Sequence, residues 1–353
     1  MTLLWNEFIA RMESGLDLES SEIQSVLDSI LREEADLESI KAFLLALHKK
    51  GASADEVAAL VEQLYRHATP ISITERAVDT VGTGGDGAHT MNISSTAAIV
   101  AAAAGARVVK HGSRAVSSKS GASDFYGALG IAYDLDAAGV ERTVRELGIG
   151  FCFAPVFHPA MKNAAPARKA LGTPTVFNFL GPLANPARPQ AAAIGVADER
   201  IHLVMAQVMA AKGCDGFVFR GDDGLDEITL DGATSVLSIG KNSISSDRID
   251  ARDFGLDAAP ISAVKGGDGQ ENADITRRIF AGERGAYRDI VLLNTAATIA
   301  AFDGELDLSL HERIQKSMPR AIEAIDSGKA TDLLQRWAAL STEISLADSS
   351  SER

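Results

Sequence analysis

Residues 77–95 read AVDTVGTGGDGAHTMNISS, and this stretch decides how the rest of the chain is interpreted. Residues 77–81 have the composition of a buried strand and run directly into a turn with four glycines. Glycine allows positive φ, and it lets successive backbone N–H groups approach an anion without side chains in the way. Asn92, Ser94 and Ser95 follow where a helix should begin, and the unpaired N–H groups of a helix start favour negative charge.

The stretch therefore predicts a strand, a phosphate-binding turn and a helix in succession. A tight turn between strand and helix, with a serine as the helix cap, is the structural alternative. The glycine spacing fits neither the G-x-G-x-x-G fingerprint of dinucleotide-binding folds nor a P-loop.

The segments on either side of this stretch differ in the pattern of their apolar residues. Upstream, apolar residues recur at helical spacing over 23–31, 37–47 and 57–64, which predicts a compact helical unit. Downstream, residues 106–110, 216–220 and 290–294 have the composition of buried strands, with helical segments between them. Strands that alternate with helices favour crossover units and a largely parallel sheet.

We therefore expect an α/β fold class with two domains. A small all-helical domain occupies residues 1–73, and a larger α/β domain with a mainly parallel central sheet flanked by helices begins at residue 74. Residues 341–353 have too little apolar content to pack, so we expect a disordered tail there.

Composition limits the class of protein. The chain has 353 residues, of which 46% are hydrophobic and 23% charged, which is typical of a globular protein. The net charge of -14 argues against a nucleic-acid partner, and no apolar run approaches the length of a membrane span. Two distant cysteines exclude a disulfide framework or a zinc site, and the first residues lack a signal-peptide pattern. We therefore expect a cytoplasmic protein that acts on small molecules.

A second polar cluster follows the strand over 106–110. It reads KHGSR at 110–114, and the Gly/Ser-rich segment SSKSGASD follows at 117–124. The carboxyl ends of parallel strands meet at one edge of a sheet, so this cluster and the glycine turn can face the same crevice. The cluster supplies cationic donors for phosphate oxygens on an otherwise acidic protein. A solvated surface loop is the alternative.

A third cluster follows the strand over 216–220. Residues 221–229 read GDDGLDEIT, and adjacent carboxylates at a strand end suit Mg²⁺, which also binds substrate phosphates. Paired carboxylates are common in an acidic chain, so alone this segment is more typical of a solvated turn. Beside two phosphate-binding loops, it favours a magnesium site.

Taken together, these segments resemble the anthranilate phosphoribosyltransferase family of the tryptophan pathway. The resemblance rests on GTGGDG at 82–87, NISS at 92–95, KHGSR at 110–114 and DE at 226–227, in this order and spacing. It also includes FAP at 153–155, HPAMKN at 158–163, FN at 177–178 and GPLANP at 181–186. It implies that helices from about 158–186 complete the helical domain, that 74–157 and 187–340 form the α/β domain, and that the helical domains pair in a homodimer.

The resemblance also implies roles for individual residues. The donor, phosphoribosyl pyrophosphate, would be held by Gly82, Gly84, Gly85, Asp86, Thr90, Asn92, Ser94, Ser95, Lys110 and Ser118. The acceptor would be held by Gly82, His111, Ser113, His158 and Arg168, and Mg²⁺ by Ser94, Asp226 and Glu227. Lys110, His111 and Arg168 would be the catalytic residues.

The implied reaction is the Mg²⁺-dependent transfer of the 5-phosphoribosyl group to the amine of anthranilate, with release of pyrophosphate. The amine is neutral at pH 7, so we expect His111 to position the acceptor rather than to act as a general base. Closure of the two domains about residues 69–73 would exclude water from the donor.

Two departures from the family pattern keep other functions open. Ser113 stands where the family usually has asparagine, and Pro174 stands where it usually has arginine. A phosphoribosyltransferase with a different acceptor is therefore the main alternative. A nucleoside phosphorylase, or a binding protein that has lost turnover, is the third interpretation.

Overall fold

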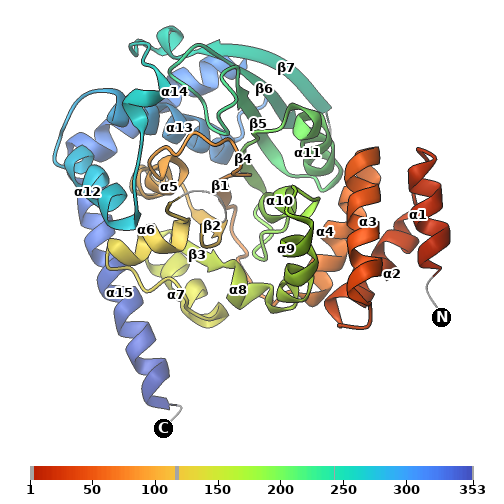
Figure 1. The fold of residues 1–353 in the computed structure, drawn as a ribbon. Coiled ribbons are helices and arrows are strands. Elements are labelled where there is room, and N and C mark those ends of the chain that lie inside the picture. Colours follow the sequence, from red (N-terminus) through yellow and green to blue (C-terminus); the bar gives the residue numbers. More distant parts are fainter. Residues whose placement is uncertain (1–3, 116–118, 242, 352–353) are drawn as a thin grey trace.

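The structure is a computed structural model that describes residues 4–115, 119–241 and 243–351. A helical unit lies on one side of an α/β unit built around one central sheet (Figure 1). This arrangement confirms the predicted fold class. Over the described ranges, no helix is long and apolar enough to cross a membrane.

The central sheet has seven strands in the order β3-β2-β1-β4-β5-β6-β7. The five strands from β3 to β5 are parallel, whereas β6 and β7 pair antiparallel at the other edge. Their bounds are β1 Val78–Gly82, β2 Val108–Gly112, β3 Ile149–Phe153, β4 Ala191–Gly195, β5 Asp215–Gly221, β6 Ala233–Gly240 and β7 Ser243–Asp250. The strands predicted over 106–110 and 216–220 correspond to β2 and β5, and the carboxyl ends of β1, β2 and β5 share one edge.

Both faces of the sheet are covered, and alternate residues of a strand belong to different cores. Ala191 and Ala193 of β4 pack in the core with α5, α13 and α14, whereas Ala192 and Ile194 pack in the core with α11 and the helical unit. The helices of the first face are α5 (Ile93–Ala103), α12 (Gly269–Phe280), α13 (Ala286–Asp303), α14 (Leu310–Asp326) and α15 (Lys329–Ser351). The second face carries α11 (Glu199–Ala211).

The helical unit comprises α1 (Trp5–Glu13), α2 (Ser20–Leu31), α3 (Leu37–Lys50) and α4 (Ala54–His67). Ser53 and Glu56 form the capping box that begins α4. Ala167 and Phe177 share the apolar core of this unit, so the middle of the chain packs against its N-terminal helices. These middle elements are η1 (Pro159–Ala164), α9 (Ala165–Leu171), α10 (Phe177–Leu180) and η2 (Gly181–Leu183).

The remaining short elements connect these parts. They are α6 (Ala122–Ala128), α7 (Ala137–Leu147), α8 (Ala154–Phe157), η3 (Ala251–Phe254) and η4 (Ile261–Val264).

The strand predicted over 290–294 is wrong, because these residues lie inside α13. Ile290, Val291 and Leu293 are fully buried, since α13 contacts α5, α14 and the sheet. A helix that is surrounded by protein is apolar on all sides and loses its helical period. A short apolar run of this kind does not distinguish a strand from a buried helix.

The predicted disordered tail is also wrong over 341–351, where α15 continues as a helix. Leu340 and Ile344 are buried in the same apolar cluster as Val144 of α7. Arg142 of α7 also pairs with Glu343 at 3.0 Å. A few well-placed contacts therefore hold this helix despite its polar composition, and residues 352–353 lie outside the described ranges.

Candidate active site

The three polar clusters predicted from the sequence meet at one edge of the sheet. The glycine turn leaves β1, the basic segment ends β2, and the carboxylate pair follows β5. The side chain of Asp226 accepts a hydrogen bond of 2.7 Å from the backbone N–H of Gly84. The structure thus brings together residues that are 142 positions apart in the sequence.

The glycine turn needs glycine for two physical reasons. Gly84 and Gly85 have φ values of 69° and 86°, in the left-handed region that favours glycine. A Cβ at Gly82 would lie 2.1 Å from a carboxylate oxygen of Asp226, so the turn and the carboxylate are in close contact there. Asp86 accepts a hydrogen bond of 3.0 Å from the N–H of Ala88, which fixes the far end of the turn.

The N-terminus of α5 lies against the second carboxylate. The N–H of Ser94 donates to Glu227 Oε1 at 3.2 Å. Lys110, which is buried, donates from Nζ to Ser94 Oγ at 3.3 Å and to the carbonyl of Thr80. Lys110 thus links β1, β2 and α5, and places a cation beside the helix start.

Burial dominates the electrostatics of this cluster. Loss of solvation raises the pKa of Asp226 to about 7, and the neighbouring Asp86 adds to the effect. Loss of solvation and the charge of Asp226 raise the pKa of Glu227 to about 8. Burial lowers the pKa of Lys110, although the nearby carboxylates oppose that shift. Burial therefore opposes ionisation of both carboxyl groups, and a bound cation would favour their charged forms.

The donor set fits magnesium. Mg²⁺ typically takes one or two carboxylates and completes its coordination with water and substrate phosphates. Asp226 and Glu227 would supply the carboxylates and Ser94 a hydroxyl. Over the described ranges, no group of three or more His, Cys, Asp and Glu side chains is arranged to hold a metal. The site therefore suits a cation that is shared with a ligand better than a closed structural metal.

His111 and His158, which are both predicted to contact the acceptor, lie side by side. Their rings lie 5.2 Å apart between centroids. His111 Nδ1 lies 2.9 Å from the carbonyl of Gly181, so Nδ1 carries the proton and donates. Burial and the neighbouring His158 lower the pKa of His111 to about 3, so the ring is neutral at pH 7. Nε2 of His111 is buried without a hydrogen-bond partner among the described residues, and it offers a lone pair.

Arg168 is the predicted cation for the acceptor carboxylate. It lies on α9 with its guanidinium over the ring of Phe177, at 5.5 Å from the ring centroid. Burial lowers its pKa, and in the part of the chain that the structure describes it makes no ion pair. His158 donates from Nε2 to the carbonyl of Ala184 at 2.8 Å, which holds its ring in place.

The other predicted site residues have these positions. Asn92 is the N-cap of α5, Ser95 is buried in its first turn, and Thr90 forms a β-bridge with Lys265. Ser113 and Pro174 are exposed, and Ser118 lies outside the described residues.

Asp79 and Asn185 were missed as candidates by the sequence reasoning. Asp79 is fully buried in β1, accepts from the N–H of His111 at 3.3 Å, and accepts from Asn185 Nδ2 at 2.8 Å. Burial raises the pKa of Asp79 to about 6. The sequence does contain one sign of Asp79, which is an aspartate inside an apolar strand. Such a group is buried only when it is hydrogen-bonded, so it indicates a polar partner nearby.

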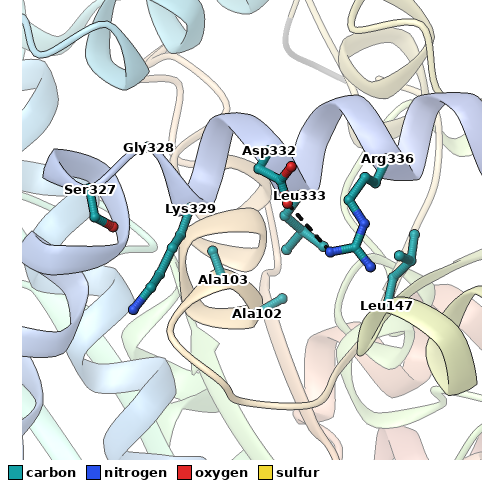
Figure 2. A pocket seen from close by; sticks show the side chains of 9 residues that line it. All are labelled: Ala102, Ala103, Leu147, Ser327, Gly328, Lys329, Asp332, Leu333 and Arg336. Carbon is teal, nitrogen blue, oxygen red and sulfur yellow. Dashed lines mark hydrogen bonds and ion pairs between the residues drawn. The ribbon is translucent and has the colours of Figure 1, made fainter.

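A surface cavity of about 350 Å³ lies away from this edge, between the ends of α5 and α7 and the start of α15 (Figure 2). Its cations are already paired. Lys329 contacts Glu323 at 2.7 Å, and Arg336 contacts Asp332 at 3.4 Å. The cavity is therefore a weaker candidate for an anion-binding site than the edge of the sheet.

Comparisons with known proteins bear on the family and the fold. Sequence models of the glycosyl transferase family match residues 6–68 for its helical bundle domain and 74–331 for its a/b domain. The chain is 47% identical over 340 residues to an anthranilate phosphoribosyltransferase of Saccharopolyspora erythraea, covering 96% of this chain and 97% of the relative.

Solved structures are similar as well. The anthranilate phosphoribosyltransferase of Thermus thermophilus matches with a TM-score of 0.88 and 37% identity, over 95% of this chain and 99% of that one. The enzyme of Saccharomyces cerevisiae, solved in complex with PRPP (phosphoribosyl pyrophosphate) and Mg, matches with a TM-score of 0.87 and 27% identity, over 97% and 99% of the two chains.

Proposed function

This chain belongs to the anthranilate phosphoribosyltransferase family, and from that premise we propose that it transfers the 5-phosphoribosyl group of phosphoribosyl pyrophosphate to the amine of anthranilate. Pyrophosphate is the second product, and the reaction belongs to tryptophan biosynthesis. One observation carries the proposal: the Asp226–Glu227 pair contacts both the glycine turn and the start of α5. That contact supports a single cleft for a metal and a diphosphate.

The donor half of the reaction follows from charge. The bond from the anomeric carbon to the pyrophosphate oxygen breaks, and the leaving group takes the electron pair while the sugar gains oxocarbenium character. The amides of the glycine turn, the N-terminus of α5 and the Lys110 cation would bind that developing charge. Mg²⁺, held by Ser94, Asp226 and Glu227, would supply further positive charge to the diphosphate.

The acceptor half follows from the neutral His111 ring. The amine nitrogen bonds to the anomeric carbon and then loses one proton, which passes to the released pyrophosphate or to solvent. Nε2 of His111 has a free lone pair and would accept a hydrogen bond from the amine N–H, which orients the nitrogen for attack. Arg168 would pair with the carboxylate of anthranilate.

The individual assignments are proposals that this chemistry supports. Donor binding is assigned to Gly82, Gly84, Gly85, Asp86, Thr90, Asn92, Ser94, Ser95, Lys110 and Ser118. Acceptor binding is assigned to Gly82, His111, Ser113, His158 and Arg168.

The purified chain tests this function with anthranilate, phosphoribosyl pyrophosphate and Mg²⁺. We expect loss of anthranilate fluorescence as N-phosphoribosyl anthranilate forms. The exposed Ser113 motivates a panel of other aromatic amines, and donor binding without turnover of anthranilate would favour a different acceptor. Phosphorolysis of a nucleoside panel should be absent, and its presence would favour a nucleoside phosphorylase.

We also propose a homodimer through the helical domain, completed by the elements over 158–186. Leu4, Leu16 and Leu37 are exposed by 56%, 58% and 44%, and they lie at or beside α1 and α3. Light scattering should give twice the mass of one chain, and Leu16→Glu should lower it. Both cysteines are free thiols, which supports the expected cytoplasmic location.

A further inference from the structure

A second glycine-containing segment lies against residues 88–91, just after the glycine turn, and has no role in the function described so far. Residues 265–272 read KGGDGQEN and lead into α12. Gly266 donates its N–H to the carbonyl of His89 at 2.9 Å, and Met91 donates its N–H to Val264 at 3.1 Å. A Cβ at Gly266 would lie 2.5 Å from Asn272 Oδ1 and 2.6 Å from the backbone of Met91. The segment is therefore packed directly against the chain that precedes α5.

Asn272 connects this segment to Asn92, the N-cap residue of α5. Asn272 is 1% exposed, and its Oδ1 accepts from the N–H of Gly267 at 2.8 Å. A backbone N–H can only donate, so this bond fixes which end of the Asn272 amide is oxygen. Its Nδ2 must then donate to Asn92, which receives it on Oδ1 at 2.8 Å.

Asn92 Oδ1 accepts a second hydrogen bond, from Ser120 Oγ at 2.9 Å. Two donors therefore occupy the oxygen end of the Asn92 amide. At the NH₂ end, one N–H points to the carbonyl of Ser120 at 3.4 Å, which leaves the other N–H for a ligand. The Asn92 side chain also makes no hydrogen bond to the first-turn amides of α5, although asparagine at this position usually does. Asn92 therefore does not cap the first turn of α5, in which the N–H of Ser94 donates to Glu227.

A second contact, four residues along both helices, has a different role. Thr276 of α12 hydrogen-bonds Thr96 of α5 at 2.9 Å, and both side chains are fully buried. This pair joins the same two helices as the Asn272–Asn92 pair. Thr96 Oγ1 also donates to the backbone carbonyl of Asn92 at 2.9 Å, whereas Thr276 bonds the Thr96 hydroxyl and not the Asn92 side chain. It therefore provides a matched control for packing between α12 and α5.

We propose that Asn272 is a positioning residue that sets the polarity of the Asn92 amide, so that Asn92 presents its NH₂ group to the oxygens of phosphoribosyl pyrophosphate. By holding the Asn92 side chain, Asn272 also keeps it from capping the first turn of α5, where the N–H of Ser94 donates to Glu227. The inference rests on the proposed function for the identity of the donor.

The variant Asn272→Asp tests this directly, because it keeps the shape and replaces the donor group with an acceptor. The side-chain amide of Asn92 must then flip, so that its NH₂ group faces the introduced carboxylate and its oxygen faces the oxygen atoms of the ligand. We expect the KM for phosphoribosyl pyrophosphate to rise by at least about tenfold, with a smaller change in kcat. Thr276→Val should lower the unfolding temperature and leave that KM unchanged.

A double-mutant cycle separates positioning from packing. In an Asn92→Ala background, Asn272→Asp should have little further effect on the KM for the donor, because no amide remains to be oriented. An equal effect in both backgrounds, or an equal rise in KM for Thr276→Val, would overturn the proposal. Should Asn272→Asp fail to fold, Asn272→Ala enters the same cycle, with the same expected non-additivity.

Calorimetric binding of phosphoribosyl pyrophosphate with Mg²⁺ distinguishes this inference from the proposed function. If the unchanged chain binds the donor but Asn272→Asp binds it equally well, the inference fails and the proposed function stands. If the unchanged chain binds no donor, the proposed function fails and the inference fails with it.

Discussion

Neutralising one carboxylate of the Asp226–Glu227 pair should affect stability and activity in opposite directions. These side chains belong to residues only 9% and 7% exposed, and their pKa values rise to about 7 and about 8 because of burial. Without metal, Glu227→Gln removes a buried charge next to another. We therefore expect the free energy of unfolding in EDTA at pH 8 to increase, on the order of 1 to 3 kcal/mol.

With Mg²⁺ and both substrates, the same variant should be nearly inactive. The pair supplies both carboxylates of the proposed metal site, and loss of one preorganised electrostatic group in such a site typically costs about 3 kcal/mol. We expect kcat/KM for the donor to fall by roughly 100-fold to 1000-fold. Asp226→Asn should behave alike, and should also weaken the contact with the N–H of Gly84.

Asp222→Asn is the matched control, because it neutralises an exposed aspartate of the same loop that pairs with Arg248. It should change stability by less than about 0.5 kcal/mol and leave activity intact. Urea unfolding with EDTA, and initial rates of anthranilate fluorescence loss over a Mg²⁺ titration, measure both effects. Unchanged kinetics for Glu227→Gln, with an unchanged Mg²⁺ requirement, would refute the assignment of the metal site.

Three further changes probe other parts of the site. Lys110→Met keeps the shape but removes the cation beside Ser94, so kcat/KM for the donor should fall by about 100-fold or more, whereas a change below about fivefold in steady-state kinetics would contradict its role. Gly82→Ala would place a Cβ 2.1 Å from Asp226, so the carboxylate must move. We expect the free energy of unfolding in urea to fall by about 1 to 3 kcal/mol and the Mg²⁺ requirement to rise. An unaltered Mg²⁺ titration would count against the contact. The pKa of His111 falls from 6.5 to about 3 on folding, so the unfolded chain binds more protons than the folded chain below pH 6.5. The stability due to the neutral ring is therefore complete above pH 6.5 and is lost as the pH falls toward 3. From pH 7 to pH 5, His111→Asn should therefore lose roughly 2 kcal/mol less stability than the unchanged chain, and parallel unfolding profiles would show that burial does not hold the ring neutral.

The sequence predicts those parts of the site that are formed by a few consecutive residues. The glycine turn and the Asp226–Glu227 pair each follow a strand, and the edge shared by parallel strands brings them together. The α/β fold class follows in the same way from alternating strand and helix patterns. The strand predicted over 290–294 failed because α13 is buried on all sides, which removes the periodicity that identifies a helix.

The parts that the sequence does not predict depend on distant packing. Asn272 contacts Asn92 across 180 positions, and nothing near either residue indicates the other. Asp79 and the neutral state of His111 depend on burial, which is set by the arrangement of β1, β2 and the middle segment of the chain. The tail over 341–351 is helical because its few apolar residues find partners on α7.

A crystal of the chain soaked with phosphoribosyl pyrophosphate and Mn²⁺, as an anomalous scatterer in place of Mg²⁺, tests the common cleft most directly. The account predicts an anomalous peak in contact with Asp226 and Glu227, and a diphosphate bound over the turn at 82–87. A donor bound in the cavity beside α15, or a metal far from the diphosphate, would contradict it.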